Sequence, residues 1–266
     1  KTAINDALYD LVARSLHLPL HKLLGGNYRD KIAICDTIGI DTIEKTVEAA
    51  KQGVKQGYKT IKLKIGKDPD LDVKRVAATR EAIGEDVELR VDANAGYQYY
   101  NAVKTLRKMD QYNLQLIEQP LPMWDLEGMA NIAEAFDTPI EADESLHSPQ
   151  SAIELIRRKA ADVFLIKLAK FGGLHNTRKI IAIAEAAGIG ITPSGQASSS
   201  VGVATAMQLY AAIWNIDFSS ECKPGFFSED VVKDPLRCEN GYLRVPTGPG
   251  IGVELDEEKL QKLHSN

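Results

Sequence analysis

Three carboxylates recur at nearly even intervals in the middle of the chain, each at the end of a short apolar run. Asp92, Glu118 and Asp143 are 26 and 25 residues apart. Like charges in a confined site repel, and they raise one another's pKa unless a cation joins them. Carboxylate oxygens are the ligands that hard ions such as Mg²⁺ prefer. The spacing therefore predicts a Mg²⁺ site made of these three residues, with Mn²⁺ as the natural substitute.

Three lysines form a second set of reactive groups. Lys62 and Lys64 alternate with apolar residues in one run, and Lys167 stands between two apolar residues in another. Alternate residues of a strand face opposite sides, so these lysines are expected to point away from the apolar face. A buried lysine near a cation has a lowered pKa and becomes a useful base. We predict that Lys64 and Lys167 are the acid/base groups and that Lys62 supports them. The alternative is that all three are structural ion pairs.

Together, the two sets indicate one kind of reaction. The proton next to a carboxylate is a very weak acid, and its removal needs a strong positive charge near the resulting anion. A metal ion supplies that charge and a neutral lysine accepts the proton. The sequence thus predicts a Mg²⁺-dependent isomerase that abstracts the proton alpha to a carboxylate and forms a metal-stabilised enolate.

These residues lie within a regular alternation of apolar runs and helical patterns. Near-continuous apolar runs are typical of strands buried on both faces of a parallel sheet. The eight runs start roughly 24 to 30 residues apart and are Lys31–Cys35, Thr60–Ile65, Val87–Ala93, Leu114–Gln119, Pro139–Glu144, Val163–Ala169, Gly188–Pro193 and Ile216–Cys222. The pattern predicts an α/β fold, a modified TIM barrel of (β/α)7β type, whose chemistry lies at the carboxyl ends of the strands. An open doubly wound sheet is the alternative.

The two ends of the chain modify the simple barrel. Residues 1–17 predict an amphipathic helix that packs on the barrel and replaces the missing eighth helix. Its expected apolar face consists of Ile4, Ala7, Leu8, Leu11 and Val12. Residues 223–266 follow the last run as a tail that is rich in Gly and Pro over most of its length. We therefore assign residues 1–266 to one barrel domain.

Composition excludes several classes of protein. The 32 basic and 37 acidic side chains give a net charge of −5 without a basic run, which argues against nucleic-acid binding. No apolar stretch approaches the roughly 20 residues that cross a bilayer. Cys35, Cys222 and Cys238 have no CxxC spacing, so neither a disulfide framework nor a zinc site is predicted. A cytoplasmic protein is the simplest expectation.

The order of the motifs resembles the muconate lactonizing enzyme (muconate cycloisomerase) subgroup of the enolase superfamily, in the broader mandelate racemase and muconate lactonizing enzyme family. The matching segments are Ala3–Asp10, Pro19–Gly26, the Lys-x-Lys at 62 and 64, Asp92–Asn94, Glu118–Pro120, Ala142–Ser145, Ile166–Lys167 with Gly172–Gly173, and Pro249–Val253. Enolase-superfamily sites are an established case of this chemistry.

The resemblance implies Mg²⁺ held by Asp92, Glu118 and Asp143, and a supporting role for Asn94. It also implies a homo-oligomer and a small carboxylate substrate. A separate N-terminal α+β capping domain that reads the substrate belongs to this resemblance, and we expect it to be missing from this chain.

The choice of substrate stays open. Glu144, Ser194, Glu221 and Lys223 are predicted to support the site or to contact substrate. No His ends the run Gly188–Pro193, which argues against mandelate racemase-like enzymes and sugar-acid dehydratases. No Asp-x-Asp follows the last run, which disfavours dipeptide epimerisation. Cycloisomerisation, racemisation or epimerisation of an amino-acid derivative, and β-elimination by an acid dehydratase all remain. A catalytically incomplete barrel, and a phosphate-binding barrel that uses residues 194–200, are the rival classes.

Overall fold

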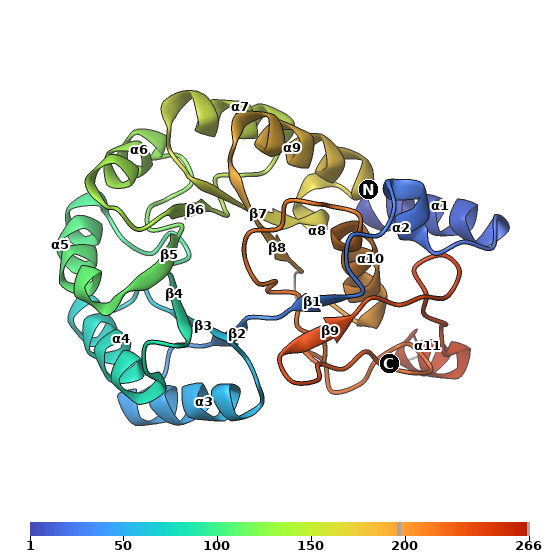
Figure 1. Cartoon of the computed structure of the whole chain (residues 1–266), viewed down its shortest axis with the longest axis horizontal. Coiled ribbons are helices and arrows are strands. Elements are labelled where there is room, and N and C mark those ends of the chain that lie inside the picture. The colour runs from blue at the N-terminus through green and yellow to red at the C-terminus, as the bar shows by residue number, and fades with distance from the viewer. Residues whose placement is uncertain (196–197, 265–266) are drawn as a thin grey trace.

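A parallel sheet that curls into a barrel forms the centre of the molecule. The computed structural model describes residues 1–195 and 198–264, with side chains up to residue 262. The seven strands of this sheet lie in chain order, and helices cover its outer face (Figure 1). They are β2 (Asp36–Ile38), β3 (Thr60–Lys64), β4 (Glu88–Asp92), β5 (Leu114–Glu118), β6 (Ile140–Ala142), β7 (Val163–Lys167) and β8 (Gly190–Ser194). The predicted α/β barrel is confirmed, and an open doubly wound sheet is excluded by the closure described below.

The connecting helices begin where polar side chains cap their first turns. Thr42, Asp68 and Ser148 accept hydrogen bonds from backbone N–H groups of the helices that follow them. The outer helices are α3 (Ile43–Lys55), α4 (Pro69–Ile83), α5 (Tyr99–Met109), α6 (Leu126–Ala135), α7 (Pro149–Arg158), α9 (Leu174–Ala187) and α10 (Ser200–Ala211). Shorter or peripheral helices are α2 (Leu20–Leu24), the 3-10 turn η1 (Asp110–Tyr112), α8 (Leu168–Phe171) and α11 (Glu257–His264).

The barrel closes differently from the prediction at both ends of the strand series. The expected first strand is wrong: β1 (Lys31–Ala33) leaves the barrel and pairs antiparallel with β9 (Tyr242–Arg244). The expected eighth strand, Ile216–Cys222, forms only an isolated bridge at Ser220.

Even so, that short segment bonds to both of its neighbours. The Cys35 N–H donates to the Ser220 carbonyl at 2.7 Å, and the Ser220 N–H donates to the Ala33 carbonyl at 2.7 Å. On its other side, the Glu221 N–H donates to the Pro193 carbonyl in β8 at 2.9 Å. Residues 220 and 221 therefore fill the eighth position.

Helix α1 (Thr2–Ser15) presents the opposite face to the one we predicted. Its apolar residues are turned outward, with Ile4 71% and Leu11 62% exposed. A polar face meets the barrel instead: Asp6 and Asn5 accept the first backbone N–H groups of α9, from Leu174 at 3.0 Å and His175 at 3.1 Å. The unpaired N–H groups at a helix start attract such acceptors, and this attraction sets the orientation of α1.

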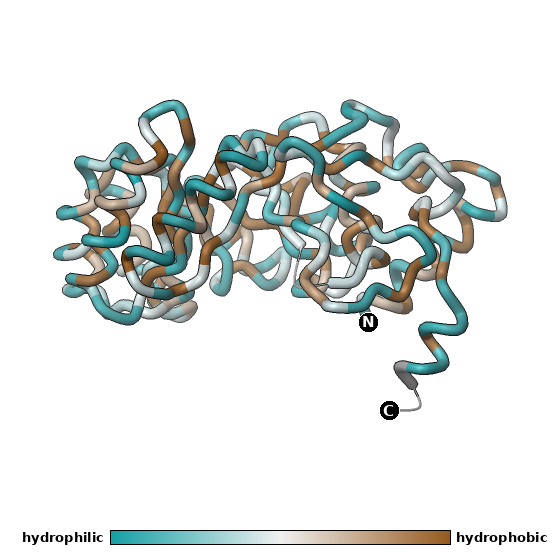
Figure 2. The backbone as a smooth tube through the Cα atoms, turned by 90° about the horizontal axis from the view of Figure 1, so that it is seen from below, coloured by the Kyte–Doolittle hydropathy of each residue, from teal (hydrophilic) through white to brown (hydrophobic). Residues whose placement is uncertain are grey.

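Polar and apolar positions alternate along most of the chain, as Figure 2 shows. No helix in residues 1–195 and 198–264 is both long enough and apolar enough to cross a membrane.

The two faces of the curled sheet differ in chemistry. Residues such as Ile61 and Leu63 belong to the apolar core between the sheet and its helices. The residues between them in sequence, and their counterparts on other strands, point inward, and several of these are polar although buried. This inner group includes Lys62, Arg90 and Glu118. The barrel interior is therefore charged at its carboxyl end.

Candidate active site

Lys62 is the most buried of the predicted lysines and joins three carboxylates. Its side chain is 2% exposed, and its Nζ lies 2.7 Å from Glu118 Oε2, 2.6 Å from Glu221 Oε2 and 3.4 Å from Asp92 Oδ2. Burial by itself lowers the pKa of this ammonium, but the three negative charges raise the pKa well above its ordinary value. Lys62 therefore stays protonated and acts as a fixed positive charge.

Lys64 is the last residue of β3 and lies nearer to solvent. Its Nζ pairs with Asp92 Oδ2 and donates to Asn94 Oδ1 at 2.7 Å. Asn94 also donates its backbone N–H to Asp92 Oδ1 at 2.8 Å and its side-chain amide to Glu144 Oε1 at 3.2 Å. Burial raises the pKa of Asp92, but Lys62 and Lys64 more than reverse this and leave that pKa below its usual value. Four predicted residues thus meet on one side of the barrel mouth.

Asp143 lies between two lysines, of which the sequence analysis identified one. Lys167 Nζ lies 2.5 Å from Asp143 Oδ2, and Lys170 Nζ lies 2.6 Å from Asp143 Oδ1. Lys170 also donates to the backbone carbonyl of Asp143. The single turn α8, directly after β7, carries Lys170 back over the mouth. Burial lowers the pKa of Lys170, whereas Asp143 outweighs burial at Lys167 and raises its pKa.

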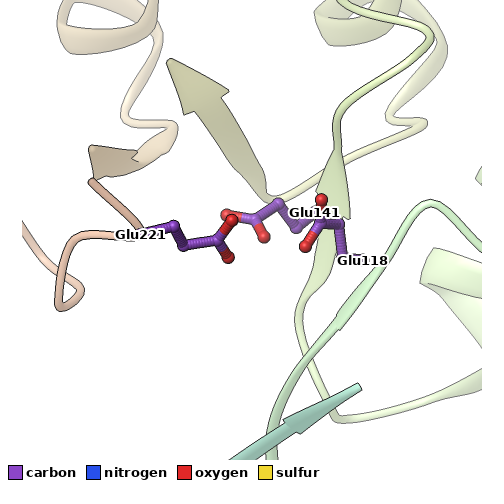
Figure 3. Close-up of side chains that lie close together, drawn as sticks. All are labelled: Glu118, Glu141 and Glu221. Carbon is purple, nitrogen blue, oxygen red and sulfur yellow. The ribbon is translucent and has the colours of Figure 1, made fainter. Parts of the chain in front are cut away.

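Glu141 is a buried carboxylate that the sequence analysis missed. It lies two residues before Asp143, so strand alternation places both on the inner face. Figure 3 shows that the carboxylates of Glu118, Glu141 and Glu221 point toward one another, and one oxygen from each lies within 4.8 Å of the others. Burial, together with the charge of Glu221, raises the pKa of Glu141 to about 8. Burial, Asp92 and Glu221 raise the pKa of Glu118 well above its usual value.

The three predicted metal ligands lie at the ends of neighbouring strands. Asp92 stands opposite Glu118 in the sheet register, and Glu118 stands opposite Glu141, two residues before Asp143. Lysine ammonium groups hold Asp92 and Asp143, while Glu118 keeps one buried oxygen, Oε1, without a hydrogen-bond partner. An all-carboxylate donor set with such an unpaired oxygen fits a hard divalent cation.

Two predicted substrate contacts have other partners, although Ser194 stands opposite Lys167 in the sheet register. Lys223 pairs with Asp36 at 2.5 Å and stands over the ring of Tyr58, 4.9 Å from its centre. Ser194 is buried at the end of β8, where its N–H donates to the Tyr210 hydroxyl at 3.1 Å. The segment 194–200 that was weighed as a phosphate loop contains residues 196–197, which lie outside the described residues.

The arrangement places one lysine on each side of the barrel mouth. Lys64 ends β3 and Lys167 ends β7, and three strands separate these two in the sheet. A flat, carboxylate-bearing substrate between them would have an ammonium or amine near each face. Proton transfer at the carbon next to the carboxylate is the chemistry that this geometry suits.

Comparisons with known proteins show which proteins the chain is similar to. A family model described as Enolase C-terminal domain-like matches residues 45–259. The chain is 38% identical to L-Ala-D/L-Glu epimerase of Clostridium acetobutylicum over 96% of its own length and 71% of that protein. It is 36% identical to muconate cycloisomerase 1 of Rhodococcus opacus over 98% of its length and 71% of that protein.

A solved structure extends the likeness to three dimensions. The dipeptide epimerase of Enterococcus faecalis V583, complexed with Mg and the dipeptide L-Leu-L-Tyr, superposes with a TM-score of 0.90 at 36% identity. The match covers 95% of this chain and 72% of that one.

Proposed function

Because the chain belongs to the enolase superfamily, in its muconate lactonizing enzyme subgroup, we propose that it is a Mg²⁺-dependent isomerase that moves the proton next to a substrate carboxylate. One observation carries the proposal. Two lysines, Lys64 and Lys167, end strands on opposite sides of the mouth, and each contacts a carboxylate at the end of a neighbouring element.

The chain's residues divide into those that hold charge and those that move a proton. Asp92, Glu118 and Asp143 would hold Mg²⁺, which when bound supplies the positive charge that stabilises a developing anion. Lys62 stays protonated among its carboxylates and holds Glu118 in place. This leaves Lys64 and Lys167 as the groups that face the reacting carbon.

Each of the two lysines would transfer a proton at one face of the reacting carbon. One takes the proton from its side of the carbon, and the other returns a proton from the opposite side, which inverts the centre. Proton transfer at one face alone suffices in cycloisomerisation, where one carboxylate of a muconate adds to the C=C bond to close a lactone and one lysine delivers a proton to the resulting enolate, or takes it back in the reverse direction. The relatives are named as epimerases, racemases and cycloisomerases, which supports isomerisation over dehydration. We propose small carboxylates as the substrate class, and the missing Asp-x-Asp favours muconates or N-substituted amino acids over dipeptides.

Deuterium exchange tests this proposal directly. The chain is incubated with Mg²⁺ in D₂O and a panel of dipeptides, N-succinyl amino acids and muconates, and proton NMR follows the signal next to the carboxylate. We expect loss of that signal for at least one dipeptide or N-succinyl amino acid, or, for a muconate, uptake of deuterium beside the carboxylate of the lactone that forms. Lys64→Ala and Lys167→Ala should each slow exchange from one face by about 10²–10⁴-fold, the usual effect of removing a general base.

A matched control separates the two lysines from a general loss of charge. Lys108→Ala removes an exposed lysine that pairs only with Asp70 at 2.8 Å, and it should leave exchange unchanged. Exchange that persists at the wild-type rate in both active-site variants would refute the proposed roles. No exchange with any member of the panel would favour the incomplete barrel.

A further inference from the structure

Three buried carboxylates converge below the proposed catalytic site. Glu118 ends β5, Glu141 is central in β6, and Glu221 belongs to the segment that closes the barrel. One oxygen from each lies within 4.8 Å of the other two, as Figure 3 shows. Of these three, only Glu118 belongs to the ligand set proposed above.

The oxygens in this cluster lack partners to an unusual degree. Glu141 is 0% exposed, and among the described residues neither of its carboxylate oxygens has a partner within ordinary hydrogen-bond distance and angle, although the Thr192 hydroxyl lies close enough to lower its pKa. Glu118 Oε1 and Glu221 Oε1 are also buried without a partner. Lys62 engages only the Oε2 atoms of these two residues. One side of the cluster is thus paired with an ammonium, and the other side presents four unpaired oxygens.

The neighbouring cations are engaged elsewhere. Arg90 donates to the side chain of Gln115 and to the carbonyl and hydroxyl oxygens of Ser219. Lys64 is paired with Asp92. If all three carboxylates are ionised, the one ammonium in contact with them, that of Lys62, leaves two negative charges, and buried charge without a partner is costly, so full ionisation of the cluster requires another cation. Water can donate hydrogen bonds to these oxygens but cannot balance their charge.

We propose that Glu118, Glu141 and Glu221 bind a second hard divalent cation, deeper in the barrel than the proposed catalytic one. The dimensions suit such an ion. Opposite oxygens around Mg²⁺ are about 4.2 Å apart and around Ca²⁺ about 4.6 to 5.2 Å apart, and one oxygen from each residue of the cluster lies within 4.8 Å of the others, close enough to share one ion. Glu118 is the shared ligand, which is how carboxylates commonly join two metals about 3.5 to 4 Å apart.

The second cation has a structural role in this proposal. It balances Glu141 and Glu221, which lie below the reacting carbon, and it fixes the carboxylate of Glu118 from below. The inference rests on the proposed function only through Glu118. The two sites have separate ligands otherwise, so each is tested by its own variant.

Metal content distinguishes the two sites without an activity assay. The chain is stripped with chelator and titrated with Mn²⁺, and bound metal is measured by plasma mass spectrometry, with electron paramagnetic resonance for spin coupling. We expect about two ions per wild-type chain, magnetically coupled through the shared carboxylate. Glu141→Gln should retain about one, with the coupling lost. Glu88→Gln, at the exposed start of β4, is the matched control and should retain about two.

Two further variants complete the test. Asp143→Asn should lose the upper ion and keep the lower one. Glu221→Gln should repeat the result of Glu141→Gln, which guards against a misfolded first variant, and circular dichroism checks folding throughout. If the wild type binds only about one uncoupled ion, and Asp143→Asn abolishes that binding, the second site is overturned while the proposed function stays intact. Two ions retained in both Glu variants would also overturn it. An ion kept by Asp143→Asn and lost in Glu141→Gln supports the second site even if no exchange reaction is found.

Discussion

Replacing Lys62 with Met removes the ammonium that holds the centre of the site together. Met has nearly the same length and no charge, so the packing volume is largely kept. Glu118 loses its only hydrogen-bond partner at Oε2, and its Oε1 already has none. Glu221 loses a contact of 2.6 Å. Both carboxylates then stay buried, and among the described residues neither has another ion-pair partner.

The size of the effect follows from this burial. Breaking a buried ion pair by removing one partner costs about 3–5 kcal/mol. An unfolding entropy of about 2.1 cal/mol/K per residue gives about 0.56 kcal/mol/K for 266 residues. A loss of about 4 kcal/mol therefore lowers the melting temperature by about 7 °C. Lowering the pH should reduce this difference, because burial raises the pKa of Glu118 and its protonation removes an unpaired buried charge.

Thermal unfolding by circular dichroism, in chelator at pH 7 and pH 5, measures both parts. The control is Lys108→Met, whose ion pair with Asp70 is 45% and 77% exposed, and which should change stability by under about 1 kcal/mol. If Lys62→Met melts as the control does at pH 7, or if its deficit grows as the pH falls, the reasoning from buried charge is refuted.

Two further predictions concern buried polar groups. Burial and Glu221 raise the pKa of Glu141 from 4.5 to about 8, so the metal-free folded protein keeps a proton that the unfolded chain has released. Its stability should therefore fall as the pH rises from about 4.5 to 8, by at most about 5 kcal/mol, and Glu141→Gln should flatten that part of the curve. The buried Tyr210 hydroxyl has one hydrogen to donate, shared between the carbonyls of Ile166 at 2.6 Å and Ser194 at 2.5 Å, and it accepts the Ser194 N–H at 3.1 Å, so Tyr210→Phe should cost about 2–3 kcal/mol.

Melting temperatures in chelator check both predictions. Equal pH slopes for the wild type and Glu141→Gln would contradict the first. For the second, Tyr99→Phe at an exposed position is the control, expected within about 0.5 kcal/mol of the wild type. A Tyr210→Phe melting temperature equal to that of the control would show that the two carbonyls find other partners.

Most of the candidate site residues could be predicted from the sequence by the alternation of side chains along a strand. A near-continuous apolar run that ends in a polar residue marks an inward side chain at a barrel mouth, and Asp92, Lys64 and Lys167 follow this rule. The same rule could have identified Glu141, because it lies two residues before Asp143 within a predicted run. Lys170 had no such signal. The turn α8 that carries it follows β7 without a linker, and a four-residue helix leaves no periodic pattern.

Other features depended on tertiary contacts that a local pattern does not contain. The sequence pattern predicted α1 and its apolar face correctly, but hydrophobicity alone does not determine which face of the helix packs against the barrel. Asn5 and Asp6 decided that, through the start of α9. Similarly, Lys31–Ala33 has strand character, yet its partner is β9, more than two hundred residues along the chain. The partner of a strand is a property of the whole fold.

Closure of the barrel by Ser220 also has a consequence for the order of assembly. Ala33 and Cys35 are synthesised well before Ser220, so their hydrogen-bond partner is missing until the intervening strands and helices have been translated. Contacts between residues so distant in sequence slow folding, and an unpaired sheet edge is a template on which another chain can add a strand. The nascent barrel therefore stays vulnerable to association with its neighbours until its last segment arrives, and refolding from denaturant is favoured at low protein concentration.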